Sequence, residues 1–525
     1  MTGSSNPQVQ NWIVRKPLAR GTGGVVAGQN LHAARAGAAV LKAGGHAVDG
    51  ALAMAMSLAA LEPWNSGLGG VGFMVVWDAK AKRAQVVDAG PVAPRRLDPG
   101  DYKLSGTEGA DLFGWPGVVD DRNAVGPLSI AVPGQAAGLA AAFERHASLP
   151  WRDLCAPAIA LADQGLPVGW YACLQITTAA PDLARFEVAA SHFLPNRLPP
   201  VPDNSGAMRY LPTRGLAQTL RRLADAGPRD LISGELGHLL VEDVQAAGGV
   251  LSLEDLAGHP ARAFDPLRRS YGGVRIQMPV GLTAGPTLDH ALALIAGKIA
   301  AGEPRAAAYL AWAEALFTAY ERRLASLGHG AETEGRRTGC TSHLCVVDAA
   351  GTMVSLTQTL LSAFGSKILS PRTGILLNNG IMWFDPRPGG PNGLAPGKRP
   401  LSNMCPVIVT HNGLPWLGIG ASGGRRIMPA VLQLMSMLID GRLDLERAFH
   451  LPRIDVSGGA TVNVDRRLAP EILAALEARF AVQEVDAMVW PKLFACPSAL
   501  LRDRTAGMVS GMTDPMQPVA GVAAA

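Results

Sequence analysis

The segment Gly339–Asp348 (GCTSHLCVVD) constrains the fold of this sequence more than any other part. Its paired valines favour a β-strand, the following Asp348–Gly351 is a turn signal, and Met353–Leu356 is typical of a returning strand. We therefore predict a β-hairpin that begins close to Thr341. Nucleophile-type side chains crowd the start of this hairpin, so the same segment bears on function.

Thr341 has the chemistry of a self-activated nucleophile if the backbone is cut just before it. A hydroxyl needs a nearby base in order to attack an amide. The α-amine freed by such a cut has a reference pKa of about 7.7–8.0, so it can accept the proton near neutral pH. The alternative is that Thr341-Ser342-His343 opens an ordinary edge strand with polar side chains facing water, because short motifs often match by chance.

Composition excludes several classes of protein. Charged residues are 17% and hydrophobic residues 48% of the 525 positions, so the chain can bury a large core and is not disordered. The formal charge is only +4, and Lys and Arg form no run longer than short pairs such as Arg95-Arg96. A nucleic-acid-binding surface normally carries a basic stripe, so we predict no nucleic-acid partner.

The six cysteines show no C-x-x-C pairing, which argues against a disulfide scaffold or a zinc site and fits a reducing compartment. The first 24 residues lack the apolar core of a signal peptide. The apolar stretch Ala51–Leu61 is too short to cross a bilayer. We therefore predict a cytoplasmic protein with no metal, no cofactor and no membrane partner.

The first third begins with two helices, predicted over Leu31–Ala43 and Val48–Leu61, the second capped by Asp49 or His46. The glycine-dense loop Ser66–Gly72 follows, and then a strand pair. This loop lies between a helix and a strand, which is the wrong order for a phosphate-binding turn. A dinucleotide site is therefore excluded.

The second half is predicted to change from helix to strand near Thr341. A long helix covers Ala306–Leu324, and the polar segment Gly328–Gly339 is the kind of exposed stretch where a chain can be cut. A further hairpin is predicted over Val407–Gly420, and Gly420–Gly424 leads into a helix that begins near Arg426.

Six segments in this order resemble the γ-glutamyltransferase family of N-terminal-nucleophile hydrolases. They are AGAAVLKAGGHAVDGALAMAMSLAALEPWNSGLGGVGFMVVWD, AVPGQAAG, TSHLCVVDAAGTMVSLTQTL, ILLNNG, PGKRPLSNMCP and GASGGRRI. Together they extend over nearly the whole chain, so the resemblance is far more specific than any single motif.

The resemblance implies a mixed α/β fold, a four-layer αββα sandwich built from two chains after self-cleavage. The cleavage site would lie between Cys340 and Thr341, giving a large chain (1–340) and a small chain (341–525) that stay together as a heterodimer, with higher oligomers possible. Thr341 aligns with the family nucleophile, two residues before His343. Cys340 is a competing nucleophile on chemistry alone, because a thiolate attacks more readily.

The resemblance also assigns roles to other residues. Thr359 would hold the α-amine of the nucleophile, and Gly423 and Gly424 would donate backbone N–H groups to the developing oxyanion. Ser402 and Asn403 would contact substrate. His343 is expected to be structural, since the α-amine already supplies the base.

Several positions depart from the glutamyl-binding pattern of the family. Gly90, Leu361, Gly380 and Trp383 stand where charged or amide side chains are expected. A glutamyl head would then lack partners for its charges, which costs kilocalories. The chain therefore resembles a divergent branch with other acyl specificity, such as oxamate amidohydrolases or cephalosporin (glutaryl) acylases.

Three hypotheses follow. The leading one is a self-processing amidohydrolase acting on a small carboxylate-bearing amide. The alternatives are a true glutathione hydrolase and a non-catalytic protein that retains the fold. Arg95, Arg96 and Lys367 are candidate partners for a substrate carboxylate, although a solvated surface charge is the favoured explanation for each.

Overall fold

The computed structural model describes residues 13–109, 115–326, 339–503 and 507–525. The predicted cleavage-prone segment Gly328–Gly339 lies, apart from Gly339, outside these described residues. The Cys340–Thr341 peptide bond itself is described and lies near the start of strand β12 (Gly339–Asp348).

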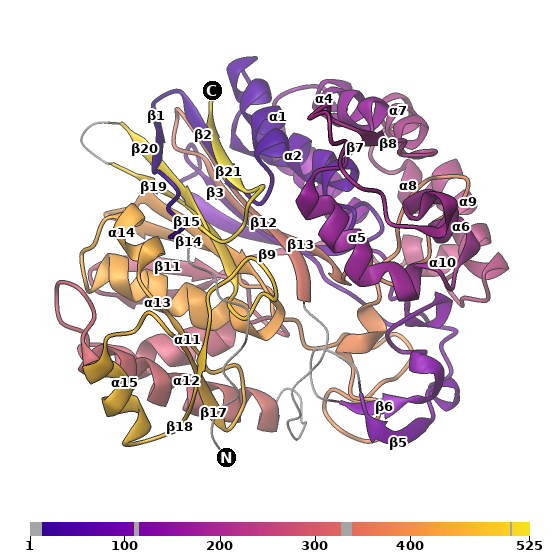
Figure 1. The fold of residues 1–525 in the computed structure, drawn as a ribbon. Coiled ribbons are helices and arrows are strands. Elements are labelled where there is room, and N and C mark those ends of the chain that lie inside the picture. Colours follow the sequence, from indigo (N-terminus) through magenta and orange to yellow (C-terminus); the bar gives the residue numbers. More distant parts are fainter. Residues whose placement is uncertain (1–12, 110–114, 327–338, 504–506) are drawn as a thin grey trace.

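Two seven-stranded sheets form the centre of the molecule (Figure 1). The first sheet contains, in spatial order, β21 (Gly521–Ala524), β2 (Gly24–Gly28), β12, β13 (Met353–Ser362), β3 (Val71–Asp78), β4 (Arg83–Ala89) and β9 (Arg262–Phe264). The second contains β1 (Ala19–Gly21), β20 (Val509–Thr513), β19 (Cys496–Arg502), β15 (Leu414–Ser422), β14 (Val407–His411), β11 (Val274–Met278) and β10 (Leu267–Tyr271). All their pairings are antiparallel.

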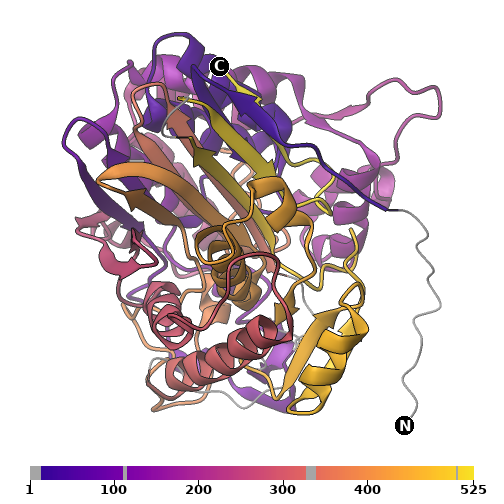
Figure 2. The same cartoon turned by 90° about the vertical axis from the view of Figure 1, so that its left-hand side faces the viewer.

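Helices lie on both outer sides of the pair of sheets, some packed against a sheet and others against neighbouring helices. They are α1 (Leu31–Lys42), α2 (Ala47–Leu61), α3 (Gln135–His146), α4 (Trp151–Gln164), α5 (Trp170–Leu183), α6 (Glu187–Phe193), α7 (Leu216–Ala226), α8 (Asp230–Ser233), α9 (Glu235–Ala246), α10 (Leu253–Ala257), α11 (Gly285–Ile295), α12 (Ala306–Ser326), α13 (Ile427–Ile439), α14 (Leu445–His450) and α15 (Pro470–Glu477). Figure 1 shows α1 and α2 on one side of the strands and α11, α12 and α13 on the other. The turned view in Figure 2 shows the strands of both sheets between these helices.

Short strands complete the structure outside the two large sheets. They are β5 (Leu104–Glu108), β6 (Pro116–Val118), β7 (Leu166–Pro167), β8 (Tyr210–Leu211), β16 (Ile454–Asp455), β17 (Thr461–Asp465) and β18 (Ala481–Val485). None of the helices in the described ranges combines the length and apolar character that a bilayer crossing requires.

Alternation along the strands explains the layers. In β2, Val25 and Ala27 pack between the sheets against Ile408 of the second sheet, whereas Val26 faces α1 and α2. Successive side chains of a strand point to opposite faces, so a strand buried on both faces is apolar throughout. The four layers are therefore helix, sheet, sheet, helix, and the αββα expectation is confirmed.

The elements predicted near the start of the chain form as expected. His46 caps α2 by accepting the Val48 N–H, while Asp49 receives the backbone N–H of His46 to complete a capping box. Gly44, with φ of +97°, follows the end of α1, in the left-handed region where glycine is favoured.

The edge-strand alternative for Thr341 is wrong. β12 lies between β2 and β13 in the interior of its sheet, and Thr341 is only 5% exposed. The segments 1–340 and 341–525 each supply strands to both sheets. Those pairings would hold the two segments together even if the connecting peptide bond were cut.

Candidate active site

A bulge marks the position of Thr341. Cys340 pairs with Leu361 and Ser342 pairs with Gln358, so Thr341 faces both Thr359 and Leu360 across the hairpin. β-Bulges interrupt the ladder, re-aim a side chain and are over-represented beside active sites. Leu361 has φ of +89°, a left-handed conformation that is uncommon for a side chain of this type.

The bulge brings together the groups that self-cleavage requires. The Thr341 hydroxyl donates to Thr359 Oγ1 at 3.2 Å, and the Thr359 hydroxyl donates to the carbonyl oxygen of Cys340. The Leu361 N–H donates to Thr359 Oγ1 at 2.7 Å and fixes this hydroxyl. One hydroxyl therefore contacts both the candidate nucleophile and the carbonyl that it would attack.

Cys340 is poorly suited to act as the nucleophile. Its side chain is buried, and burial raises the pKa of its thiol to about 11, although Lys492 and Lys367 act in the opposite direction. The reactive form of cysteine is the thiolate, which is scarce near pH 7 at such a pKa. This electrostatic argument favours Thr341 over Cys340.

Gly423 and Gly424 form the turn between β15 and α13. Their φ angles are +135° and +63°, in the region that favours glycine. A Cβ at Gly423 would lie 2.9 Å from the Cα of Ala495, whereas a Cβ at Gly424 would have no neighbour within 4 Å. Backbone packing therefore requires glycine at 423, and backbone conformation favours it at 424.

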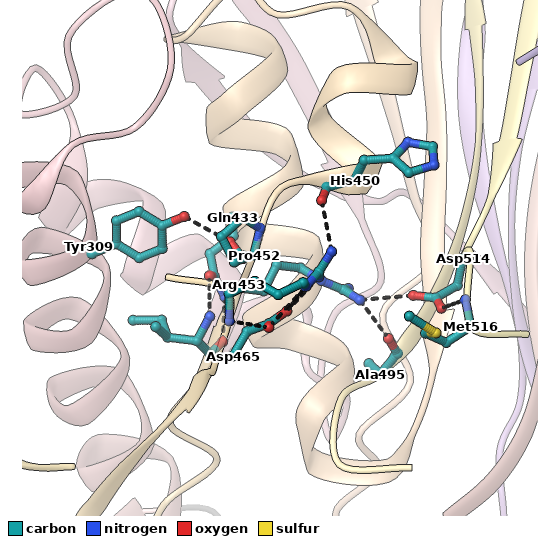
Figure 3. Close-up of polar contacts among 11 residues, drawn as sticks. Tyr309, Gln433, His450, Pro452, Arg453, Asp465, Ala495, Asp514 and Met516 are labelled. Carbon is teal, nitrogen blue, oxygen red and sulfur yellow. Dashed lines mark hydrogen bonds and ion pairs between the residues drawn. The ribbon is translucent and has the colours of Figure 1, made fainter. Parts of the chain in front are cut away.

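A largely buried ion pair between Arg453 and Asp514 lies next to Ala495 (Figure 3). Arg453 Nη2 donates to the Asp514 carboxylate at 2.8 Å and to the Ala495 carbonyl at 3.2 Å. Ala495 is the residue that packs against Gly423. Arg453 thus holds the backbone on which the candidate oxyanion turn rests.

Ser402 and Asn403 are organised by a buried arginine that sequence reasoning missed. Arg323 Nη2 donates to the Ser402 carbonyl at 2.6 Å and to Asn403 Oδ1 at 3.2 Å, and Nη1 donates to the Thr283 carbonyl. Burial lowers the pKa of Arg323 to about 10. No hydrogen bond joins Ser402 or Asn403 to Thr341 within the described residues.

His343 is fully buried, and its Nδ1 lies 2.9 Å from Thr357 Oγ1. Burial lowers the pKa of His343 to about 3, so the ring is neutral at working pH. A neutral ring that contacts Thr357 and Cys345 fits the expected structural role.

A buried carboxyl group, that of Glu62, lies next to the start of the β12–β13 hairpin. Glu62 Oε2 accepts the Asn65 amide at 2.8 Å and the Ser342 hydroxyl at 3.2 Å. Burial raises the pKa of Glu62 to about 7, with Asn65, Lys492 and Ser342 opposing that effect. The motif Leu61-Glu62-Pro63 gave no local signal of this role, because the partners of Glu62 include a residue 280 positions away.

Apolar packing occupies the positions where the glutamyl pattern is lost. Leu361 and Trp383 belong to one buried cluster with Phe73, Met382 and neighbouring apolar residues. A Cβ at Gly90 would lie 2.4 Å from Phe73 Cζ, and a Cβ at Gly380 would lie 2.7 Å from that of Ala131. Neither glycine position has room for a longer side chain without rearrangement.

The three cations that the sequence offered as partners for a substrate carboxylate lie in different environments. Arg95 is half exposed and pairs with Glu254, and Arg96 is exposed. Lys367 is buried, and its Nζ donates to the Gly365 carbonyl at 2.9 Å and to Ser362 Oγ at 3.3 Å. The surface interpretation is therefore wrong for Lys367.

Another lysine lies closer to the cleavage site. A small pocket of about 20 Å³ is lined by Cys340, Gly423 and Lys492, together with Asn65, Gln175, Ser422, Arg426, Trp490, Phe494 and Cys496. Burial alone would lower the pKa of Lys492, but interactions with Cys496 and Tyr171 outweigh it and hold the pKa above its ordinary value. In sequence Lys492 follows Pro491 in an irregular stretch and carries no signal that separates it from a surface lysine.

Comparisons with known proteins find relatives over most of the chain. The Gamma-glutamyltranspeptidase family model matches residues 33–334 and 325–524. The chain is 32% identical over 511 residues to the Acylase ACY 1 proenzyme of Pseudomonas sp. (strain SE83), covering 90% of this chain and 89% of the relative. It is 31% identical over 459 residues to Glutathione hydrolase 3 of Arabidopsis thaliana, covering 78% of this chain and 69% of the relative.

A solved structure matches over the whole length. The cephalosporin acylase from Bacillus halodurans superposes with a TM-score of 0.85 and 25% sequence identity, covering 100% of this chain and 99% of that one. Acylases and glutathione hydrolases are thus both similar to this chain, and the two groups differ in the acyl group that their names imply.

Proposed function

This chain belongs to the γ-glutamyltranspeptidase family of hydrolases and acylases, and we propose that it is a self-processing amidohydrolase of non-glutamyl specificity. It would cut its own Cys340–Thr341 bond and then hydrolyse an amide of a small carboxylate-bearing acid. Residues 1–340 and 341–525 would remain paired as a heterodimer. The observation that carries the proposal is the contact of Thr359 with both Thr341 and the Cys340 carbonyl.

Self-cleavage would proceed by an N-to-O acyl shift. Thr341 Oγ1 attacks the carbonyl carbon of Cys340 and loses its proton, while the Thr359 hydroxyl stabilises the negative charge on the carbonyl oxygen. Breaking the peptide C–N bond gives an ester between the Cys340 acyl group and Thr341 Oγ1, and the nitrogen takes the proton. Water then hydrolyses the ester, which leaves a Cys340 carboxylate and a free Thr341 α-amine.

Substrate turnover would use the same hydroxyl with the new base. The α-amine of Thr341 takes the Oγ1 proton as the oxygen attacks the substrate amide, and it returns the proton to the leaving amine. Backbone N–H groups of Gly423 and Gly424 would stabilise the oxyanion. Water then cleaves the acyl-enzyme ester, releasing the acid and restoring Thr341.

The apolar surroundings of Thr359 support a preference for acyl groups other than glutamyl. Its neighbour Leu361 packs with Trp383 in an apolar cluster, and Phe73 fills the space beside Gly90. A glutamyl α-ammonium would find no acceptor among these side chains, and a buried charge without a partner is costly. This supports an acylase-type substrate over glutathione.

The test is a denaturing gel followed by a hydrolysis screen. The purified protein should run as two chains instead of one 54.7 kDa band. The screen should compare γ-glutamyl, glutaryl and succinyl p-nitroanilides with oxamate. Hydrolysis restricted to the γ-glutamyl compound would replace this proposal with a true glutathione hydrolase, and an uncut chain that cleaves nothing would favour a non-catalytic protein.

A further inference from the structure

The pocket beside Cys340 contains a part-buried ammonium with spare hydrogen-bonding capacity. Lys492 Nζ donates to Tyr171 Oη at 2.5 Å and to Gln517 Oε1 at 2.7 Å, and it lies 5.1 Å from the centre of the Tyr171 ring. An ammonium has three N–H donors, so one remains. No ion pair forms at Lys492 in the part of the chain that the structure describes.

A second donor in the same pocket lacks a partner. Gln175 also lines this pocket, it is 2% exposed, and its Nε2 makes no hydrogen bond to any described residue. A buried amide N–H without an acceptor is energetically costly. Two residues with unused N–H donors, one of them charged, therefore line one pocket, and an anionic acceptor there could pair with both.

The remaining charges around the pocket leave it positive. Arg426 also lines it and donates to the Lys492 carbonyl at 2.5 Å, so it fixes the backbone of that residue. Glu62 interacts electrostatically with Lys492 but is itself buried, and its pKa is raised to about 7. Much of the Glu62 population is neutral near pH 7, so it offsets the ammonium only in part.

The pocket is positioned to receive the acyl group. In self-cleavage the acyl group that moves to Thr341 Oγ1 is that of Cys340, and the Cys340 side chain lines this pocket. A substrate acyl group would be esterified to the same Thr341 oxygen, so it would extend from the same atom as the Cys340 acyl group. Gly423, from the candidate oxyanion turn, borders the pocket as well.

We propose that Lys492 and Gln175 together bind the terminal carboxylate of the substrate's acyl group, so that the enzyme selects mono-amides of short dicarboxylic acids. This assignment rests on the proposed Thr341 chemistry and adds the residues that set its specificity. It differs from the candidates taken from the sequence, because Arg95 and Arg96 lie on the surface and the amine of Lys367 is bonded to Gly365 and Ser362.

The test compares two substrates that differ only in the carboxylate. Glutaryl p-nitroanilide carries it, and pentanoyl p-nitroanilide has a methyl group in its place. Lys492→Met should lower kcat/KM for the glutaryl compound about 10- to 100-fold through KM, as expected for loss of a charge-assisted hydrogen bond. Cleavage of the pentanoyl compound should change less than about threefold.

Two further variants test the same preference for the carboxylate. Gln175→Leu should act in the same direction with a smaller loss, and Lys492→Arg should retain part of the preference because it keeps the charge. Lys367→Met is the matched control, since Lys367 is a buried lysine that acts on the Cys340 thiol but does not line the pocket. It should leave the glutaryl-to-pentanoyl ratio unchanged.

Equal losses on both substrates, or an unchanged glutaryl rate, would overturn the assignment. If Lys492→Met fails to fold or to cut itself, inhibition of the wild-type enzyme decides instead. Glutarate should then inhibit at least about tenfold more strongly than pentanoate, and Gln175→Leu should reduce that difference; equal inhibition contradicts the assignment. Thr341-dependent cleavage without glutaryl preference refutes this inference alone, whereas absence of any Thr341-dependent cleavage refutes the proposed function.

Discussion

The hydroxyl of Thr341 lies 3.2 Å from that of Thr359, and the Thr359 hydroxyl in turn donates to the carbonyl that precedes Thr341. The two threonines are 18 positions apart and meet across a bulge in the β12–β13 hairpin. The arrangement places the candidate nucleophile, the preceding carbonyl and a hydroxyl that contacts both in one connected network.

Replacing Thr341 by Ala should give a stable, uncut and inactive precursor, because the same hydroxyl serves self-cleavage and turnover. A denaturing gel should show one band of 54.7 kDa. Ser342→Ala is the control, since Ser342 bonds Glu62 and Ser66 but not the Cys340 carbonyl; it should still be cut. Normal two-chain maturation of the Thr341 variant would rule out Thr341 as the processing nucleophile.

Replacing Thr359 by Val should slow self-cleavage about 100- to 1,000-fold, which is the usual cost of removing one oxyanion donor. Thr359→Ser should restore most of the rate, because it keeps the hydroxyl. The matched control is Thr357→Val on the same strand, whose hydroxyl contacts His343 instead. The rate is measured from the disappearance of the precursor band with time. Similar rates for the two Val variants would contradict the assigned role of Thr359.

Replacing Gly424 by Val should abolish turnover more severely than it impairs folding. A side chain at φ of +63° strains the backbone, and relief of that strain would move the N–H proposed to face the oxyanion. Gly413, in the β14–β15 turn, has φ of +73° and equally open surroundings. Gly413→Val should therefore lose similar thermal stability with normal activity. Wild-type kcat in the Gly424 variant would remove this glycine from the mechanism.

Hydrolysis of γ-glutamyl p-nitroanilide should be at least about 100-fold slower than that of glutaryl p-nitroanilide, and transfer to peptide acceptors negligible. The two compounds differ by the α-ammonium, which the cluster around Leu361 and Trp383 cannot bind. Gly90→Arg should not rescue glutamyl activity, because Phe73 and Arg399 occupy the adjacent space. Efficient glutathione cleavage, with kcat/KM of about 10⁴ M⁻¹s⁻¹ or more, would refute this prediction.

Glu62 should make the fold less stable as the pH rises. The pKa of Glu62 is about 7 in the folded chain against an ordinary value of 4.5, so the folded state holds a proton that the unfolded state releases between these values. The contribution of Glu62 to the free energy of unfolding therefore falls as pH rises from about 4.5 to 7, by roughly 3 kcal/mol in all. In the uncut Thr341→Ala background, Glu62→Gln should raise Tm at pH 8 relative to its parent more than at pH 5. A difference in Tm that does not vary with pH would show that Glu62 titrates normally.

Much of the architecture could be predicted from the sequence because its signals are local. The helices that begin at Leu31 and Ala47, the hairpin after Thr341 and the glycine turn at Gly423 follow from periodicity, caps and turn residues. Six ordered motifs likewise identified the family, since their order along the chain needs no coordinates. The position of Thr341 as candidate nucleophile belongs to this local information.

Only the tertiary structure decided which distant residues share the site. Thr341 lies in a central strand and not at an edge because β2 pairs with β12, a contact between segments more than 300 positions apart. Lys492, Gln175 and Cys340 line one pocket although no local pattern links them. Strand register and sheet-to-sheet packing set these neighbours, and both depend on long-range contacts that alternation along a single strand does not encode.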